Sequence, residues 1–401
     1  TTSNQPNKGT LDLTDSQMKI WSGQMLNPNS PLYNMIFKFE IKGQVNVKKF
    51  KHAFQTLINQ HDVLRLKIAL ENDQPKQVFL ETVESDLEYL DFSSELSPVD
   101  SLNKWIKNDK IRPFNPEELL YNTALFKMKT GVYTWYINQH HLITDGWSVA
   151  LLLEKLSAYY VSDFEITDMK SMNGTYSDHA KRLGQNNYSS TPFWDKKKAD
   201  ITGLPSLYGN KLPTTETRSD RYKVQLGAAL TSRLRAFCLD DDIRAWTTDL
   251  SLYHIFLTAI NLLIYKTSGQ SFFSVGVPSH NRFTPKDKQI AGLFMGLLPV
   301  SSVISDSDSL LDVFKKTRDE SFEVLKNASN AVLPNELLRS FNVILNFIPQ
   351  KFPDFAGLPM QSEWIHSGHH DPAHHIRLQI HDFDNQGDYQ LLFDLKNQVF
   401  E

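Results

Sequence analysis

Residues 140–148 read HHLITDGWS, in which two adjacent histidines stand three residues ahead of an Asp-Gly pair. The segment follows an apolar-polar alternation over residues 133–137, which is typical of a β-strand. The residues after it, 149–160, are rich in Leu and Ala and predict a helix, with Asp145 or Ser148 as its N-cap. The segment is therefore predicted to be a short loop between a strand and a helix.

The histidine pair is open to four interpretations. The rings can be structural and bond only to the backbone. They can bind zinc, although neighbouring side chains on a strand point to opposite faces. They can belong to a Ser-His-Asp hydrolase, although the nucleophile-elbow pattern GxSxG is absent from the sequence. In the fourth interpretation one ring faces the core and holds the loop, while the other faces a cavity and accepts a proton near pH 7.

The sequence around this segment predicts an α/β fold. The N-terminal half predicts a strand, a helix and a second strand over residues 33–41, 50–58 and 64–70, then a hairpin over 123–139 that turns at Gly131. Residues 165–220 are polar and rich in turn residues, so we expect a boundary between two lobes there. Beyond it, helices are predicted over 230–237 and 251–266, and strands over 272–278, in 292–304, and in the late segments FNVILNFIP and YQLLFDL.

Length and charge narrow the class of protein. A chain of 401 residues suits two lobes, and a net charge of −4 gives no electrostatic reason to expect nucleic acid. A single cysteine, Cys238, excludes an intrachain disulfide and fits a cytoplasmic protein. The N-terminal TTSNQPNKGT lacks the apolar core of a signal peptide, and the longest apolar stretch, His254–Tyr265, is too short to span a bilayer. We therefore expect no membrane association.

A second group of histidines lies in SGHHDPAHHI, residues 367–376, with His366 before it and His381 after it. Pro372 predicts a turn that could bring such ligands together, but a solvent-facing or cavity-lining loop is the simpler interpretation. No metal site is predicted.

The order of several motifs resembles that of the condensation domains of nonribosomal peptide synthetases and of their relatives, the chloramphenicol-acetyltransferase-like acyltransferases. The loop has the form HHxxxDG, and NQHDVLR is similar to the RHExLR motif of the family, with Asp62 in place of Glu. The other stretches that carry the resemblance are LTDSQMKIWSGQMLNPNSPLYNM, TYSDHA, FWDKKKADITGLP, VGVPSHNR, GLFMGLLP and FNVILNF, which together run nearly from end to end.

The resemblance implies a V-shaped pseudo-dimer of two acetyltransferase-like lobes, residues 1–180 and 181–401, with a central tunnel and the HHxxxDG loop at its middle. It implies no tightly bound cofactor. Two carrier-protein partners would deliver small-molecule substrates on 4'-phosphopantetheine arms, and an acceptor amine or hydroxyl would attack the donor thioester. We expect a monomer.

The resemblance also implies roles for single residues. His141 is expected nearest the chemistry, as a general base or as a positioning group. His140 and Asp145 would support the loop, and Gly146 would lie where the donor arm passes. Two arginines are expected as structural support: Arg282, which would pair with Asp145, and Arg65. Tunnel-lining candidates are Tyr33, Trp147, Ser148, Asn346 and Gly296, the last in a Met-Gly pair where the family often has Val-Asn.

Three other functions share these motifs. An epimerization domain carries HHxxxDG but needs a second acid or base. An acyltransferase that acts alone would use coenzyme A. An inactive recruitment platform would be expected to lose part of the His-His-Asp-Gly set, which is complete here.

Overall fold

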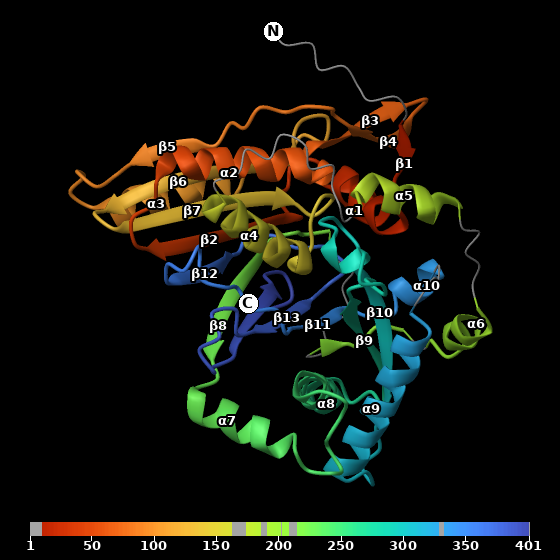
Figure 1. Ribbon diagram of the computed structural model, residues 1–401. Helices are drawn as coiled ribbons and strands as arrows, with labels where there is room; N and C mark the ends of the chain where they lie inside the picture. The colour runs from red at the N-terminus through yellow and green to blue at the C-terminus, as the bar shows by residue number, and fades with distance from the viewer. Residues whose placement is uncertain are drawn as a thin grey trace. The chain divides into compact units, whose positions relative to one another are not determined.

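The structure is a computed structural model that describes residues 10–162, 174–185, 191–201, 203–207, 215–328 and 333–400 (Figure 1). The chain forms two compact units, and it enters each of them three times. Unit 1 comprises Thr1–Asn187, Arg282–Phe294 and Gln350–His369, and unit 2 comprises Tyr188–Asn281, Met295–Pro349 and His370–Glu401.

Unit 1 is built on a five-stranded sheet with the strand order β12-β2-β7-β6-β5, beside a three-stranded sheet with the order β1-β4-β3. Its elements are β1 (Leu11–Asp12), α1 (Asp15–Leu26), β2 (Asn34–Lys42), α2 (Val47–Gln60), the 3₁₀ helix η1 (Asp62–Arg65), β3 (Leu66–Glu71), β4 (Gln74–Phe79), β5 (Glu88–Asp91), α3 (Pro98–Asp109), β6 (Tyr121–Lys129), β7 (Val132–His140), α4 (Gly146–Val161), α5 (Tyr176–Gln185), η3 (Asp287–Gln289) and β12 (Met360–Ile365).

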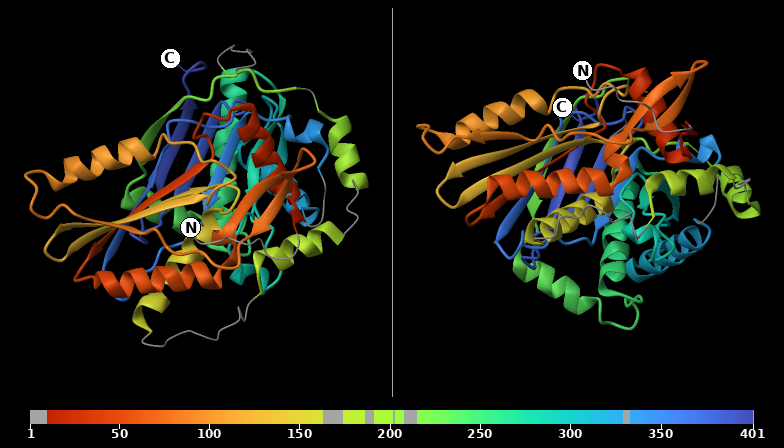
Figure 2. Two further views of the ribbon diagram at one scale, coloured as in Figure 1. Left: turned by 90° about the horizontal axis from the view of Figure 1, so that it is seen from above. Right: turned by 45° about the horizontal axis from the view of Figure 1, so that its top comes forward.

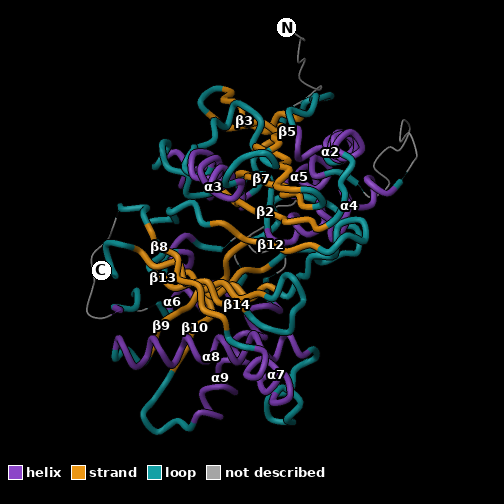
Figure 3. The backbone as a smooth tube through the Cα atoms, turned by 90° about the vertical axis from the view of Figure 1, so that its left-hand side faces the viewer, coloured by secondary structure: helices purple, strands orange, loops and turns teal. Residues whose placement is uncertain are grey.

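The central strand β7 is covered by helices on both faces. The ring of Trp135 contacts Phe50 and Phe54 of α2 at centroid distances of 6.0 and 6.4 Å. The next residue, Tyr136, contacts Trp105 of α3 at 5.1 Å. Because successive side chains of a strand point to opposite faces, α2 and α3 cover opposite faces of the sheet, as Figure 3 shows. The strand that ends at the histidine pair is thus held in the core of unit 1.

The outermost strand of this sheet comes from late in the chain. β12 pairs antiparallel with β2, with Trp364 opposite Phe37, and their rings stack at 5.4 Å. In Figure 2 the blue β12 lies beside the red β2, which is followed by the yellow hairpin of β6 and β7. Unit 1 therefore depends on residues more than 300 positions apart in the sequence.

Unit 2 is built on a six-stranded sheet with the order β10-β9-β11-β13-β14-β8. Helices α7, α8 and α9 lie on one side of this sheet (Figures 1 and 3), where the apolar side chains of the strands form the core. Its elements are α6 (Pro192–Ala199), β8 (Ser219–Gln225), α7 (Ala228–Phe237), α8 (Thr248–Ser268), β9 (Phe272–Ser279), β10 (Gly296–Val303), α9 (Leu310–Lys326), α10 (Asn335–Leu338), β11 (Val343–Ile348), β13 (Ile376–His381) and β14 (Gln390–Lys396).

Helix α8 corrects one expectation from the sequence. The helix has 21 residues, which is long and apolar enough to cross a membrane by length and composition, so the length criterion applied to His254–Tyr265 was wrong. Its side chains nevertheless belong to the core of unit 2, as predicted. It buries the polar residues Ser251, His254 and Asn261, and Asn261 donates to Thr317 of α9 at 3.2 Å.

The predicted elements recur in the structure with small shifts. The hairpin turns at Gly131, which has φ +70°, and residues 33–41 form β2 almost as expected. Leu64 was expected in a strand but lies in η1, and β3 begins at Leu66. Residues 1–9 and parts of the stretch 165–220 lie outside the described residues. The division into acetyltransferase-like lobes at residue 180 stays a prediction, as do their V-shaped arrangement and the tunnel.

Candidate active site

The HHxxxDG segment is a tight loop between β7, which ends at His140, and α4, which begins at Gly146. Asp145 is the N-cap of α4: it has extended backbone angles, and its carboxylate accepts from the N–H of Ser148 at 2.9 Å. Of the two predicted caps, Asp145 is therefore the one the helix uses. The first turn of the loop is closed by a bond from Ile143 N–H to the carbonyl of His140, 3.0 Å.

His140 is fully buried, and both of its ring nitrogens have partners. Nδ1 accepts from the backbone N–H of Leu142 at 3.1 Å, so Nδ1 carries the lone pair and Nε2 carries the hydrogen. Nε2 lies 3.1 Å from Oε1 of Gln24, which accepts that hydrogen. Burial, together with the neighbouring His141, lowers the pKa of His140 to about 3. His140 is therefore a neutral ring that holds the loop.

Gln24 presents its oxygen to His140 because its nitrogen is already used. Nε2 of Gln24 donates to the carbonyls of Asn27 and Ser30 at 2.9 and 3.0 Å. The amide orientation and the tautomer of His140 therefore agree with each other.

His141 has the opposite tautomer. Its Nδ1 lies 2.7 Å from the carbonyl of Thr144, and because a carbonyl can only accept, Nδ1 carries the hydrogen. Nε2 consequently carries the lone pair and is the proton-accepting nitrogen of this ring. The backbone N–H of His141 donates to the carbonyl of Tyr33 at 2.9 Å, and the side chain is half-buried. The loop thus fixes one ring in the form that a base requires.

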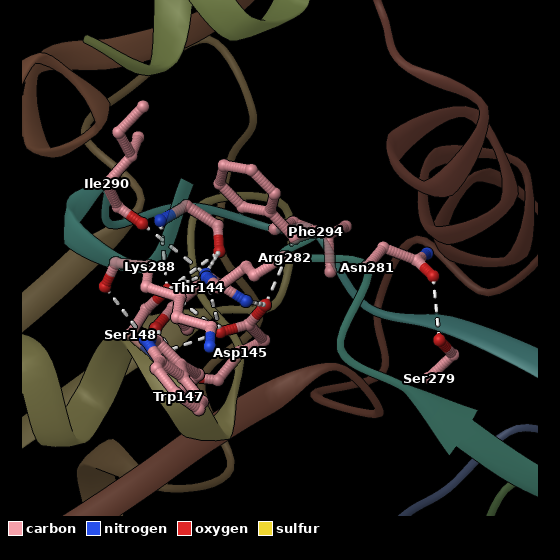
Figure 4. Close-up of polar contacts among 12 residues, drawn as sticks. Thr144, Asp145, Trp147, Ser148, Ser279, Asn281, Arg282, Lys288, Ile290 and Phe294 are labelled. Carbon is pink, nitrogen blue, oxygen red and sulfur yellow. Dashed lines mark hydrogen bonds and ion pairs between the residues drawn. The ribbon is translucent and has the colours of Figure 1, made fainter. Parts of the chain in front are cut away.

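Asp145 forms a fully buried ion pair with Arg282 (Figure 4). Nη1 of Arg282 donates to Oδ2 at 2.7 Å and Nη2 donates to Oδ1 at 3.1 Å. Burial by itself would raise the pKa of Asp145, but the charge and hydrogen bonds of Arg282, with backbone N–H groups of Ser148 and Phe294, outweigh it and lower the pKa. The carboxylate is therefore charged and structural.

Ser148 ties this ion pair to the segment that carries Arg282. Its hydroxyl oxygen lies 2.8 Å from Asp145 Oδ1, to which it donates, and 2.8 Å from the carbonyl oxygen of Gly292. The N–H of Gly292 in turn donates to this hydroxyl at 2.9 Å. The indole of Trp147 donates to the carbonyl of Lys288 at 3.1 Å. As Figure 4 shows, the start of α4 and residues 282–294 form one polar cluster. The Asn281 side chain in the same view bonds to Ser279 instead.

Asp62, the residue that replaces Glu in the family motif, supports this cluster from another side. Its carboxylate accepts from the N–H groups of Tyr176 and Ser177 at 2.9 and 3.0 Å, at the start of α5. The hydroxyl of the buried Tyr176 donates to the carbonyl of Leu293 at 2.9 Å. The motif therefore acts on the cluster through Tyr176.

The other predicted site residues are placed as follows. Tyr33 is buried and packs edge-on against His140 at 6.1 Å. A Cβ added to Gly146 would meet nothing within 4 Å, so there is open space beside the loop. Arg65 donates to the carbonyls of Leu80 and Asn59, at 2.9 and 2.7 Å, and also to that of Ile58. These bonds close the end of α2, so support of the HHxxxDG loop by Arg65 stays a prediction without a direct contact.

Asn346 and Gly296 belong to unit 2. Asn346 lies in β11, opposite Gln379 of β13, and Gly296 is the first residue of β10; both are half-buried. Their expected place in a tunnel stays a prediction.

Three histidines of the segment 366–381 have separate partners. His375 bonds to the side chain of Asn342 at 3.1 Å, His374 stacks on Phe341, and His369 bonds to the hydroxyl of Ser30. Within the described residues, no group of three or more His, Cys, Asp or Glu side chains is arranged to hold a metal ion.

Sequence reasoning missed two buried glutamines of α1. Gln24 contacts His140, and Gln17 donates to the carbonyl of Leu142 at 3.1 Å. Their signal was available: they are seven residues apart, which places them on one face of a helix, and both lie in the opening motif.

The chain is similar to known proteins over nearly its whole length. Residues 7–338 match the family described as Condensation domain. Surfactin synthase subunit 1 and the dimodular nonribosomal peptide synthase, both of Bacillus subtilis strain 168, are each 22% identical over 97% of this chain. The chain spans only 11% and 16% of the length of those two proteins.

Solved structures share the fold. The starter condensation domain of rhizomide synthetase superposes with a TM-score of 0.82 at 19% identity, over 98% of this chain and 90% of that one. The first condensation domain of the CDA synthetase gives a TM-score of 0.80 at 17% identity, over 98% and 92%. The predicted two-lobed α/β fold class is therefore confirmed. The chain belongs to the condensation domain family, whose members are acyltransferases that form amide bonds in nonribosomal peptide synthetases.

Proposed function

We propose that this domain joins an acyl or peptidyl thioester, carried on the 4'-phosphopantetheine arm of one carrier protein, to an amine or hydroxyl carried on a second. The observation that carries the proposal is the tautomer of His141, whose Nδ1–H is bound by Thr144 O so that Nε2 is the proton acceptor. Family membership supports the reaction class. The cytoplasmic location predicted from the single cysteine belongs to the same proposal.

The reaction needs one proton to be moved. The acceptor nitrogen attacks the thioester carbonyl carbon and a C–N bond forms. Nε2 of His141 takes the proton that the nitrogen loses as the tetrahedral intermediate develops. The C–S bond then breaks, and the same proton passes to the departing thiolate, so that the ring returns to its neutral form. No other reactant is required.

The contribution of His141 depends on the acceptor. A general base typically contributes about 10²–10⁴-fold, and holding two reactants in line can contribute as much or more. A neutral amine is a strong nucleophile and loses its proton late, whereas a hydroxyl needs the base earlier. We therefore propose that His141 positions a free amine and acts fully as a base towards a hydroxyl.

The neighbouring residues give the donor arm a path and the loop its rigidity. The open space beside Gly146 supports a passage for the narrow phosphopantetheine arm close to the backbone. The buried Asp145–Arg282 pair supports a fixed start for α4, from which Trp147 and Ser148 project. In this proposal Arg282 and Asp145 act on the loop and do not touch substrate.

The test uses the full chain with acyl-loaded donor carrier proteins from the neighbouring reading frames, and with acceptor carrier proteins that are loaded with either an aminoacyl or a hydroxyacyl group. Intact-mass analysis follows product formation for the parent, His141→Ala, and the matched control His52→Ala, which changes an exposed histidine of α2. We expect the control to equal the parent, and His141→Ala to lose about 10²-fold or more with a hydroxyl acceptor. A fully active, folded His141→Ala variant would exclude the proposed role.

Two further arms separate the rival functions. If coenzyme A thioesters replace the donor carrier without loss of rate, the domain is an acyltransferase that acts alone. If a single loaded carrier exchanges its α-proton in D₂O, and no amide or ester forms, the domain is an epimerization domain.

A further inference from the structure

Both backbone polar atoms of Leu142, which belong to the two peptide groups on either side of it, are held by side chains. Its N–H donates to Nδ1 of His140 at 3.1 Å, and its carbonyl accepts from Nε2 of Gln17 at 3.1 Å. Leu142 directly follows His141 and itself is fully buried. The orientations of these two successive peptide groups therefore limit how the chain can leave His141.

Both hydrogen bonds of Leu142 connect it to helix α1. Gln17 contacts Leu142 directly, and Gln24 contacts it through His140. The two glutamines are separated by seven residues, which is about two helical turns, and at most 1% of either residue is exposed. Met18 and Met25, the residues that follow the two glutamines, are exposed. The helix thus turns both amides towards the loop.

The orientation of Gln17 is determined by a second set of partners, as that of Gln24 is. Oε1 of Gln17 accepts from the backbone N–H of Thr14 at 3.0 Å, in a capping box at the start of α1. Nε2 also donates to Oε1 of Gln77 at 3.2 Å. The nitrogen of Gln17 and the oxygen of Gln24 are therefore the atoms presented to the loop.

We propose that α1 is the positioning element for the HHxxxDG loop, in which Gln24 selects the tautomer of His140 and Gln17 fixes the carbonyl of Leu142. If His140 carried its hydrogen on Nδ1, two N–H donors, of His140 and Leu142, would point at each other. The turn would have to shift, and with it the Thr144 carbonyl that orients His141. Gln17 and Gln24 are positioning residues, and the catalytic consequence rests on the proposed function of His141.

The test compares two substitutions at one position. Gln24→Met and Gln24→Glu both remove the donors to Asn27 and Ser30, but only the glutamate keeps an acceptor for Nε2–H of His140. The matched control is Gln55→Met on α2, because Gln55 also bonds to backbone groups, Val83 O and Ser85 N–H, away from the loop. Imidazole ¹⁵N chemical shifts of the full chain, with ¹⁵N-histidine at pH 8, report the tautomer of each ring.

In the parent we expect Nε2–H for His140 and Nδ1–H for His141. In Gln24→Met we expect His140 to become a mixture of tautomers, the His141 signals to move, and kcat to fall about tenfold with KM nearly unchanged, as for a base that is misplaced but not removed. Gln24→Glu should keep the parental tautomers and recover most of the rate, and Gln55→Met should match the parent.

Parental ring signals for both histidines in Gln24→Met, or equal behaviour of the Met and Glu variants, would overturn the proposal. If the Met variant does not fold, the Glu variant decides alone: parental tautomers support the proposal and a mixture contradicts it. The ring signals do not depend on the reaction. A fully active His141→Ala variant beside the expected Gln24 result would therefore reject the proposed function and leave the positioning role of α1 intact.

Discussion

Replacement of Arg282 by methionine tests the buried ion pair between Arg282 and Asp145. The exposed fraction of the side chain is 0% for Arg282 and 2% for Asp145. Methionine fills much of the volume but leaves the Asp145 carboxylate buried without its cation. Removal of one partner of a buried ion pair typically costs about 3–5 kcal/mol, so we expect a loss of about 4 kcal/mol in the free energy of unfolding at pH 7.

The loss should depend on pH in a defined direction. In the parent the pKa of Asp145 is lowered, so its contribution to stability is present above the pKa of the unfolded chain and is lost only as the pH falls through the folded value. In Arg282→Met burial, which is the largest influence and raises the pKa, is opposed only by the hydrogen bonds that Asp145 accepts from Ser148 and Phe294, so we expect the pKa to rise. The variant therefore loses stability as the pH rises through that raised pKa, and each pH unit of acidification recovers at most about 1.4 kcal/mol.

Urea unfolding followed by far-UV circular dichroism at pH 7 and pH 5 measures both effects. Arg218→Met is the control, since the exposed Arg218 pairs with Glu216 in contact with solvent, and we expect its loss to change the free energy of unfolding far less. Adding Asp145→Asn to the variant removes the buried charge while keeping a good N-cap, and should restore at least about 1 kcal/mol at pH 7. A loss below about 1 kcal/mol, or one that is the same at both pH values, would refute this account of the ion pair.

Three further outcomes follow from the same geometry. The ring of His140, whose pKa is about 3, should stay neutral down to about pH 4 in a ¹⁵N NMR titration. The free energy of unfolding should fall as the pH drops from about 6.5 towards 3. Protonation of the ring near pH 6 would contradict its burial. Gly292→Ala should destabilise the protein by about 2 kcal/mol or more in urea unfolding, because a Cβ there would lie 2.1 Å from the Tyr176 ring; an unchanged midpoint would show that the ring can move. Gly146→Ala should change the free energy of unfolding by no more than about 0.5 kcal/mol, since its Cβ meets nothing within 4 Å. It should nevertheless raise KM for the loaded donor carrier in the condensation assay. An unchanged KM would place the donor arm elsewhere.

The sequence predicted well those features that depend on local periodicity. The β6–β7 hairpin, α2 and α4 follow from alternation, helical spacing and an N-cap, each of which is written within about 15 residues. Leu64 was misassigned because its apolar alternation with Leu66 continues through a 3₁₀ turn. The length of α8 was underestimated because polar residues interrupt its apolar run while facing the core.

The candidate site was only partly predictable. Family motifs pointed to His141 and to the pairing of Asp145 with Arg282, which the structure brings within 2.7 Å. The spacing of Gln17 and Gln24 placed both on one helix face, but it could not show their contacts, because the hydrogen bonds between these glutamines and the loop join residues more than 100 positions apart. A histidine tautomer likewise depends on which groups surround the ring, and periodicity carries no information about them.

The late origin of β12 has a consequence for synthesis on the ribosome. At about 5–20 residues per second, roughly 15–60 s pass between the emergence of β2 and that of the strand that covers its edge. During this interval β2 would present Phe37 and Phe39 beside an unpaired edge, which is a template for aggregation. The nascent chain should therefore need a chaperone that recognises extended apolar segments until residue 365 has left the exit tunnel.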